Sequence, residues 1–223
     1  MEIISSIIPK GRPNRPGIAM TPKYITIHET DNYSKGADAK AHASYLRTTS
    51  EKVSWHYTVD DKCAYQHLPN NETAYHAGDG KLGLGNSKSI GIEICVNKGG
   101  DFNRACENAA ELVRKLMGVH NIPISNVVQH NRWNGKNCPS NLRKSGWKEF
   151  IALCAKQEEK DMSKEEVLAI IKEYEENKAK QTASDWAKES FDAATKAGVL
   201  DGSAPKAPVT REMLATVLRR LGF

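Results

Sequence analysis

Strand-like and helix-like patterns of hydrophobic residues alternate over the first 155 residues of the chain. Residues 23–29 alternate with a period of two, so Ile25 and Ile27 face one side and His28 faces the other. In residues 89–97, isoleucines at alternate positions lie opposite Glu93, a carboxylate in the middle of an apolar strand. Strands are predicted at residues 23–29, 53–60, 63–68, 89–97 and 127–130, the second and third forming a hairpin.

Apolar residues at helical spacing predict helices at residues 37–49, 103–120 and 147–155. Beyond them the pattern changes: residues 156–162 are charged and unpatterned, and Ser163 to Glu166 form a capping box that opens a new helix. Two more helices are predicted at about 184–197 and from Thr210 to Gly222. We therefore expect an α/β domain at 1–155, a linker at 156–162 and a small all-α domain at 163–223.

Composition and charge narrow the function classes. Of the 223 residues, 39% are hydrophobic and 26% charged, and no run reaches the length of a membrane span, so no membrane partner is expected. Residues 1–160 hold 22 Lys and Arg against 16 Asp and Glu, a net charge of +6, whereas residues 161–223 hold 10 against 11, a net charge of −1. The basic part suits an anionic matrix. The absence of a nucleic-acid motif argues against nucleic acid as a partner.

The first ten residues, M-E-I-I-S-S-I-I-P-K, lack the basic start and the long apolar run of a signal peptide. We therefore expect the protein to accumulate in the cytoplasm of the cell that makes it. In that compartment the odd count of five cysteines argues against a disulfide framework. Cys63, Cys95, Cys106 and Cys154 are expected to be small apolar residues of the core, whereas Cys138 belongs to the motif described next.

The segment from residue 129 to 139 reads Q-H-N-R-W-N-G-K-N-C-P and carries His130, Lys136 and Cys138. Imidazole and thiolate are both good zinc ligands, and a catalytic zinc usually takes three protein ligands. The spacing suits a strand that ends at His130 and a loop that returns Cys138 to the same point, with Lys136 nearby. A histidine and a cysteine alone are more often structural, but His28, at the end of its strand, completes a His2Cys set.

Five motifs occur in order between about residues 20 and 150: I-T-I-H-E-T, S-W-H-Y-T-V-D-D, A-G-D-G, S-I-G-I-E-I-C and H-x5-K-x-C-P. Together they resemble the zinc-dependent N-acetylmuramoyl-L-alanine amidases of the type 2 family, especially the endolysins of phages and prophages of Gram-positive bacteria. The resemblance implies a mixed central sheet flanked by helices, as in peptidoglycan-recognition proteins. It also implies a zinc hydrolase that cuts the amide bond between N-acetylmuramic acid and L-alanine in bacterial peptidoglycan, after release from the host cytoplasm.

The resemblance also assigns roles to single residues. The zinc ligands would be His28, His130 and Cys138. Glu93 would move the proton of the attacking water, and Lys136 would stabilise the oxyanion. His76, in the Gly-rich segment 74–85, either touches substrate or braces its loop. Trp55 stands where some relatives have a tyrosine that serves the active site, and because an indole cannot exchange a proton in that way, we expect only a substrate contact.

Two alternatives share this fold. One is a peptidoglycan-recognition module that binds without cleaving; such members typically lack the cysteine ligand, which this chain keeps at Cys138. The other is a host autolysin or sporulation amidase with the same chemistry, which the missing signal peptide disfavours.

The C-terminal segment 185–222 contains D-W-A-K-E-S, A-G-V-L-D-G and P-V-T-R-E-M-L-A. It resembles a single S-layer-homology repeat, which implies binding of a secondary cell-wall polymer, with Trp186 and Arg211 as candidate contacts. Met213 replaces the usual acidic residue and such repeats normally come in threes, so self-association through these helices is the alternative. The codons for residues 157–159, Gln-Glu-Glu, can spell a purine-rich ribosome-binding sequence shortly before Met162. Translation that starts at Met162 would then give a second, shorter product.

Overall fold

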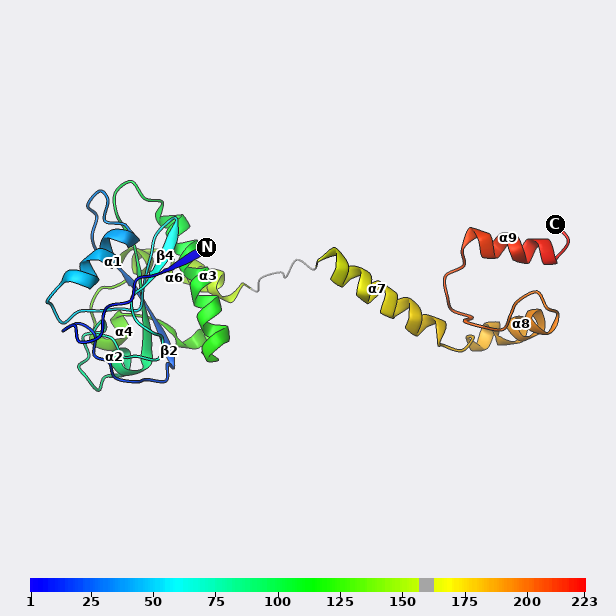
Figure 1. Cartoon of the computed structure of the whole chain (residues 1–223), viewed down its shortest axis with the longest axis horizontal. Helices are drawn as coiled ribbons and strands as arrows, with labels where there is room; N and C mark the ends of the chain where they lie inside the picture. The colour runs from blue at the N-terminus through cyan, green and yellow to red at the C-terminus, as the bar shows by residue number, and fades with distance from the viewer. Residues whose placement is uncertain (157–162) are drawn as a thin grey trace. The chain divides into compact units, whose positions relative to one another are not determined.

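The structure, a computed structural model, describes residues 1–156 and 163–223. The chain divides into two compact units, residues 1–157 and 158–223 (Figure 1). Of the linker predicted at 156–162, only Lys156 is among the described residues. Met162, the predicted start of a shorter product, lies outside them.

A six-stranded mixed sheet forms the centre of the first unit. Its strands are β1 (Glu2–Ser5), β2 (Tyr24–Glu29), β3 (Tyr57–Val59), β4 (Cys63–Gln66), β5 (Ser89–Ile94) and β6 (Val127–Gln129). Their order is β1-β4-β3-β5-β2-β6, and neighbours are parallel except β3 and β4, which form the predicted hairpin. The register sets His28 beside Glu93 and Glu93 beside Thr58, so these three side chains share one face of the sheet.

Helices cover both faces of this sheet (Figure 1). They are α1 (Ala39–Thr48), α2 (Leu84–Lys88), α3 (Phe102–His120), α4 (Asn131–Asn134), α5 (Ser140–Lys144) and α6 (Trp147–Ala155), with a 3-10 turn η1 (Ile124–Asn126). The isoleucines of β2 and β5 lie in one core cluster with Leu112 and Val113 of α3 and Phe150 of α6. This apolar face is the one that the alternating pattern predicts.

The opposite face of the sheet is polar at its centre and carries the candidate chemistry. Thr26, His28 and Ser89 are buried there, and the hydroxyl groups of Thr26 and Ser89 share a hydrogen bond of 2.5 Å. A second, smaller apolar cluster beside this region contains Leu46 of α1, together with Trp55 and Leu68. The central strands therefore bury one face in the large apolar core and present the site on the opposite, polar face.

The predicted fold class, a mixed sheet flanked by helices, is confirmed, and α1, α3 and α6 lie within two residues of their predicted bounds. The predicted strands are present but mostly shorter. β1 was not predicted, because its four residues E-I-I-S leave a largely exposed strand that is too short to show a period. The short helices α2, α4 and α5 were not predicted either, since four or five residues carry too little pattern.

The second unit is helical, as predicted. Its helices are α7 (Lys164–Ala179), which begins with the predicted capping box at Ser163, α8 (Asp185–Lys196) and α9 (Arg211–Arg220), capped by Thr210. No residue between 163 and 223 is buried, and α7 exposes a stripe of apolar side chains that includes Ile170 and Tyr174. Among the described residues, no helix is both long and apolar enough to cross a membrane.

Candidate metal centre and active site

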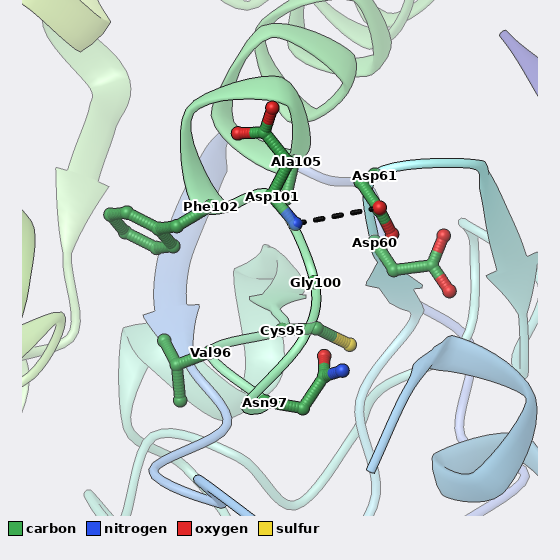
Figure 2. Close-up of a pocket in the computed structure, with 9 residues that line it drawn as sticks. All are labelled: Asp60, Asp61, Cys95, Val96, Asn97, Gly100, Asp101, Phe102 and Ala105. Atoms are coloured by element: carbon green, nitrogen blue, oxygen red, sulfur yellow. Dashed lines mark hydrogen bonds between the residues drawn. The ribbon is translucent and has the colours of Figure 1, made fainter. Parts of the chain in front are cut away.

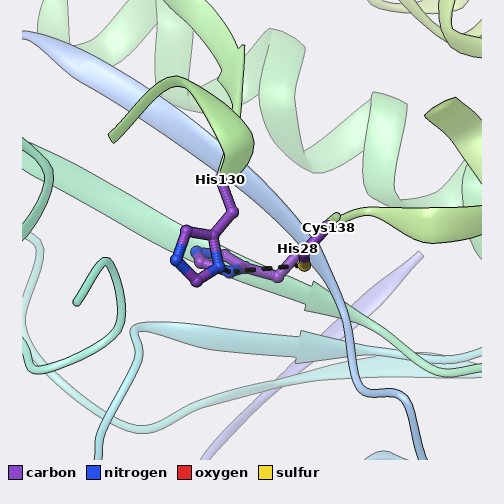
Figure 3. A group of neighbouring side chains, drawn as sticks. All are labelled: His28, His130 and Cys138. Atoms are coloured by element: carbon purple, nitrogen blue, oxygen red, sulfur yellow. Dashed lines mark hydrogen bonds between the residues drawn. The ribbon is translucent and has the colours of Figure 1, made fainter. Parts of the chain in front are cut away.

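His28, His130 and Cys138 come together at one end of the central strands (Figure 3). One ligand atom from each lies within 4.8 Å of the other two. The two Nδ1 atoms of the histidines are 3.0 Å apart, and the Cys138 sulfur lies 3.9 Å from Nδ1 of His28. Tetrahedral zinc, with bonds of about 2.0–2.1 Å to nitrogen and 2.3 Å to sulfur, requires donors roughly 3.3–3.6 Å apart. The two distances of 3.0 and 3.9 Å lie on either side of this range, so shifts of a few tenths of an ångström at these two pairs would bring the donors to zinc spacing.

Backbone pairing brings the two histidines together. β2 and β6 are parallel, and the backbone N–H of His130 donates to the carbonyl of Ile27, which extends the ladder by one residue. The loop that follows closes when the N–H of Asn131 donates to the carbonyl of Cys138 over 3.0 Å. The side chain of Asn131 also donates to the carbonyls of residues 135 and 136. This is the return of the chain that the seven-residue spacing predicts.

The hydrogen bonds of the two rings define which nitrogen atoms are free. Nε2 of His130 lies 3.0 Å from the carbonyl of Ala77, and a nitrogen beside a carbonyl must carry the proton. Nε2 of His76 lies 3.3 Å from the carbonyl of Ser89 and therefore carries a proton, so Nδ1 of His76 is an acceptor. It accepts a hydrogen bond of 2.9 Å from Nε2–H of His28. Both Nδ1 atoms at the site are then unprotonated lone pairs that face each other. Such an arrangement repels unless a cation lies between them, so the donor set itself favours a metal.

A buried carboxylate fixes the cysteine loop. Glu29 is 4% exposed, and its side chain accepts hydrogen bonds of 2.8 to 3.2 Å from the hydroxyl of Ser140, the backbone and side-chain amides of Asn141, and the N–H of Leu142. These donors form the start of α5, directly after Cys138. Glu29 follows His28 at the end of β2. This strand end therefore carries the ligand His28 itself and, through Glu29, also fixes the loop of the ligand Cys138.

Glu93 lies beside the three donors, with Oε1 at 3.7 Å from Nδ1 of His28. Its Oε2 is buried and has no hydrogen-bond partner among the residues that the structure describes. Burial raises the pKa of the Glu93 carboxyl to about 8, while the positive charge of Lys136 acts in the opposite direction. Burial likewise raises the pKa of the Cys138 thiol to about 12. A bound cation would favour the anionic form of both groups. Lys136 itself is exposed, in the loop between the two ligands.

The other residues singled out from the sequence lie in different settings. His76 is 8% exposed and lies against His28, a position of support rather than an open surface. Trp55 is 7% exposed; its N–H donates to Thr58, and its ring lines a hollow with Thr30, His42 and Tyr45. In the second unit Trp186 is 89% exposed, and Arg211 is exposed at the first position of α9.

A second hollow of the first unit is lined by acidic side chains (Figure 2). The Asp60 carboxylate accepts hydrogen bonds from the backbone N–H groups of residues 39, 62 and 63. The Asp61 carboxylate accepts a 3.4 Å hydrogen bond from the N–H of Asp101. These carboxylates serve turns and helix ends, so this hollow has a structural role.

Fold and donor set together define the class: a mixed-sheet protein with a candidate site for one divalent metal at the end of its central strands. The family profile of N-acetylmuramoyl-L-alanine amidases matches residues 18–141, a span that contains the three candidate ligands, Glu93 and Lys136. The chain therefore belongs to the N-acetylmuramoyl-L-alanine amidase family.

Individual relatives agree with this assignment. The chain is 53% identical over 149 residues to N-acetylmuramoyl-L-alanine amidase CwlH and 55% identical over 152 residues to N-acetylmuramoyl-L-alanine amidase XlyA, both from Bacillus subtilis (strain 168). These matches cover 67% and 68% of this chain, and 59% and 50% of the relatives, so the chain spans between half and three fifths of their length. The solved catalytic domain of XlyA superposes with a TM-score of 0.67 at 54% identity, over 69% of this chain and 99% of that domain.

Proposed function

We propose that the protein is a zinc-dependent peptidoglycan hydrolase that cleaves the amide bond between N-acetylmuramic acid and L-alanine. The observation that carries the proposal is the set of His28, His130 and Cys138 with two facing Nδ1 lone pairs, beside the partly buried carboxylate of Glu93. Its support is that the matched relatives bear the name of this activity.

The residues of the site divide the chemistry among them. His28, His130 and Cys138 would hold zinc, which supplies Lewis-acid activation of water and of the amide carbonyl. Glu93 takes the proton of the attacking water and returns it to the leaving alanine nitrogen, because it is the carboxylate on the same face of the sheet. The ammonium group of Lys136 donates to the oxygen that gains negative charge as the carbonyl carbon becomes tetrahedral.

The test uses purified Gram-positive peptidoglycan and the full chain. We expect the turbidity of the suspension to fall, a strong chelator to stop the fall, and added zinc to restore it. Mass spectrometry should find free stem peptides that begin with alanine, and intact lactyl-bearing glycans. Binding to the walls without release of peptide would identify a recognition module instead, and sugar-chain fragments would identify a glycosidase.

We propose further that the second unit binds a secondary cell-wall polymer through Trp186 and Arg211. Its support is the exposure of both side chains and the resemblance of residues 185–222 to a wall-binding repeat. In a pull-down on purified walls, Trp186→Ala and Arg211→Ala in the full chain should lower retention, whereas Lys206→Ala should not. Equal retention of all three would exclude these contacts.

Self-association is the second candidate for these helices, and the exposed apolar stripe of α7 favours it. Sedimentation of the full chain and of Ile170→Glu separates the two cases, since only an oligomer built on this stripe is dissociated by the change.

We also propose a role in lysis, in which the protein accumulates in the host cytoplasm and reaches the wall after release. A solved relative at 55% identity is described as an endolysin from Bacillus subtilis, which supports this role.

A further inference from the structure

We propose that His76 is a positioning residue, which holds His28 with Nδ1 toward the metal position and Nε2 away from it. The inference rests on the proposed zinc function and deepens it. It gives the Gly-rich segment between β4 and α2 a role in ligand orientation.

A continuous chain of hydrogen bonds carries the inference. The carbonyl of Ser89, the first residue of β5, accepts from Nε2 of His76 over 3.3 Å. Nδ1 of His76 then accepts from Nε2 of His28 over 2.9 Å, and the two rings meet edge to face at a centroid distance of 5.0 Å. Because each ring has one donor and one acceptor when neutral, the fixed carbonyl at one end determines that His28 presents an unprotonated Nδ1 at the other.

The surroundings of His76 are built to hold the ring in this place. Gly91 of β5 lies beneath it, and a Cβ at that position would lie 2.8 Å from the ring atoms, closer than real contacts allow. The backbone N–H groups of His76 and Ala77 both donate to Oδ1 of Asn86 over 2.8 Å. Asp79 in turn accepts from the N–H groups of Gly85 and Asn86.

The same short segment orients the second histidine. The carbonyl of Ala77 accepts from Nε2 of His130, and the side chain of Asn134 donates to that carbonyl as well. Residues 76 and 77 therefore determine the tautomers of both imidazole ligands, one through a side chain and one through the backbone. Outer-shell partners of this kind typically contribute 10- to 100-fold to metal affinity.

The experiment measures zinc affinity of the full chain by competition with a chelating dye, without reference to turnover. His76→Leu keeps a similar volume but has no acceptor, and we expect its zinc dissociation constant to rise by about 10- to 100-fold. His76→Asn keeps an acceptor near the position of Nδ1 and should recover most of that loss. His67→Leu is the matched control, because His67 is also buried but bonds to Thr58 and not to a candidate ligand; its zinc affinity should match the parent chain.

Nitrogen-15 NMR of the parent chain tests the same inference without any substitution, so it stands even if a variant does not fold. We expect the zinc-loaded protein to show His28 protonated at Nε2 and His76 protonated at Nε2. A His28 ring protonated at Nδ1, or equal zinc affinity of His76→Leu and the parent chain, would overturn the proposal. Failure of the parent chain to bind zinc at all would instead remove the proposed function.

Discussion

Each candidate ligand owes its orientation to a neighbour that does not itself bind the metal. His28 is oriented by His76, His130 by the carbonyl of Ala77, and the Cys138 loop by Glu29. A donor held by a partner loses less conformational entropy when a metal binds, so pre-orientation raises affinity. The chemistry of the three donors is visible in the sequence, but the arrangement that makes them useful is not.

At the residue scale, Glu93→Gln separates proton transfer from metal binding. The amide keeps the shape of the carboxylate but cannot accept the water proton, so the rate of peptide release should fall by about 100-fold or more. Zinc content, measured by atomic absorption, should stay at that of the parent chain. A variant with the parent's rate would show that another group moves the proton.

Cys138→Ser tests the ligand set. The hydroxyl is a far weaker zinc ligand than the thiolate, so zinc affinity and turnover should fall together, each by more than about 10-fold. Cys154→Ser is the matched control, because Cys154 is buried in α6 within the apolar core. It should lose stability in urea but keep its zinc content; loss of zinc in both variants would point to general unfolding.

Some residues carry a chemical signal of their own in the sequence. Ligand type and spacing predict His28, His130 and Cys138 as one set, and the structure brings these three together. A carboxylate in an apolar strand draws attention to Glu93, and the resemblance to the amidases predicts its role. His76 and Glu29 could not be assigned in the same way, because their roles depend on which atoms lie beside them after folding. The signal for Glu29 is weak: an acidic residue next to a ligand, whose partners at residues 140–142 lie more than 100 positions away.

At the scale of elements, the docking of α5 on the end of β2 depends on Glu29. Glu29→Gln retains one acceptor oxygen but turns an NH2 group toward backbone N–H donors, which leaves buried groups unpaired. We expect a loss of about 1–3 kcal/mol in the free energy of unfolding, together with weaker zinc binding. Glu107→Gln is the control, since its pair with Arg104 is exposed and should contribute no more than about 1 kcal/mol. Denaturant titration of the zinc-free chains makes the comparison.

Buried neutral histidines of the sheet and its loops give the fold a defined acid limit. Burial lowers the pKa of His56 to about 4 and that of His67 to about 3, below the ordinary value of 6.5. Between the lowered pKa and the ordinary value of 6.5, the unfolded chain binds more protons than the folded chain. The free energy of unfolding therefore falls as the pH drops below about 6.5 and does not change through these groups above it. Each such histidine should lower the free energy of unfolding by about 2 kcal/mol when the pH falls from 7 to 5.

Urea denaturation at several pH values checks this limit. His67→Gln should show a shallower dependence on pH than the parent chain, because it removes one histidine whose pKa is lowered by burial. An unchanged slope in His67→Gln would contradict the assignment.

Elements differ in how far the sequence determines them. The helix at 102–120 is predicted almost to the residue, because its apolar stripe is long and Asn121 ends it with a left-handed backbone. The loops that build the site are set by contacts distant in sequence. The Gly-rich segment 74–85 is an example, because its shape comes from Asp79, Asn86 and the space above Gly91, none of which its composition shows.

At the scale of the whole molecule, the two units differ in charge and in burial. The part up to residue 160 has a net charge of +6 and a large apolar core, whereas residues 161–223 have a net charge of −1 and, where described, no buried residue. Attachment to an anionic wall should therefore come from two physically different sources. The first is electrostatic and screened by salt over about 10 Å at 0.1 M. The second depends on exposed aromatic and apolar side chains such as Trp186.

Salt separates these two sources. We expect a chain that ends at Lys156 to bind purified walls at low ionic strength and to lose most of that binding at about 0.5 M salt, where the Debye length falls to a few Å. The full chain should retain part of its binding at the same salt, because the apolar contact of Trp186 is not screened, whereas a charged contact of Arg211 is. The shortened chain contains the entire sheet and core, and the solved XlyA domain shows that this portion of a relative is structured alone. Equal loss of binding in both chains at high salt would mean that the C-terminal helices do not hold the wall, and concentration-dependent sedimentation of the full chain would then assign them to self-association.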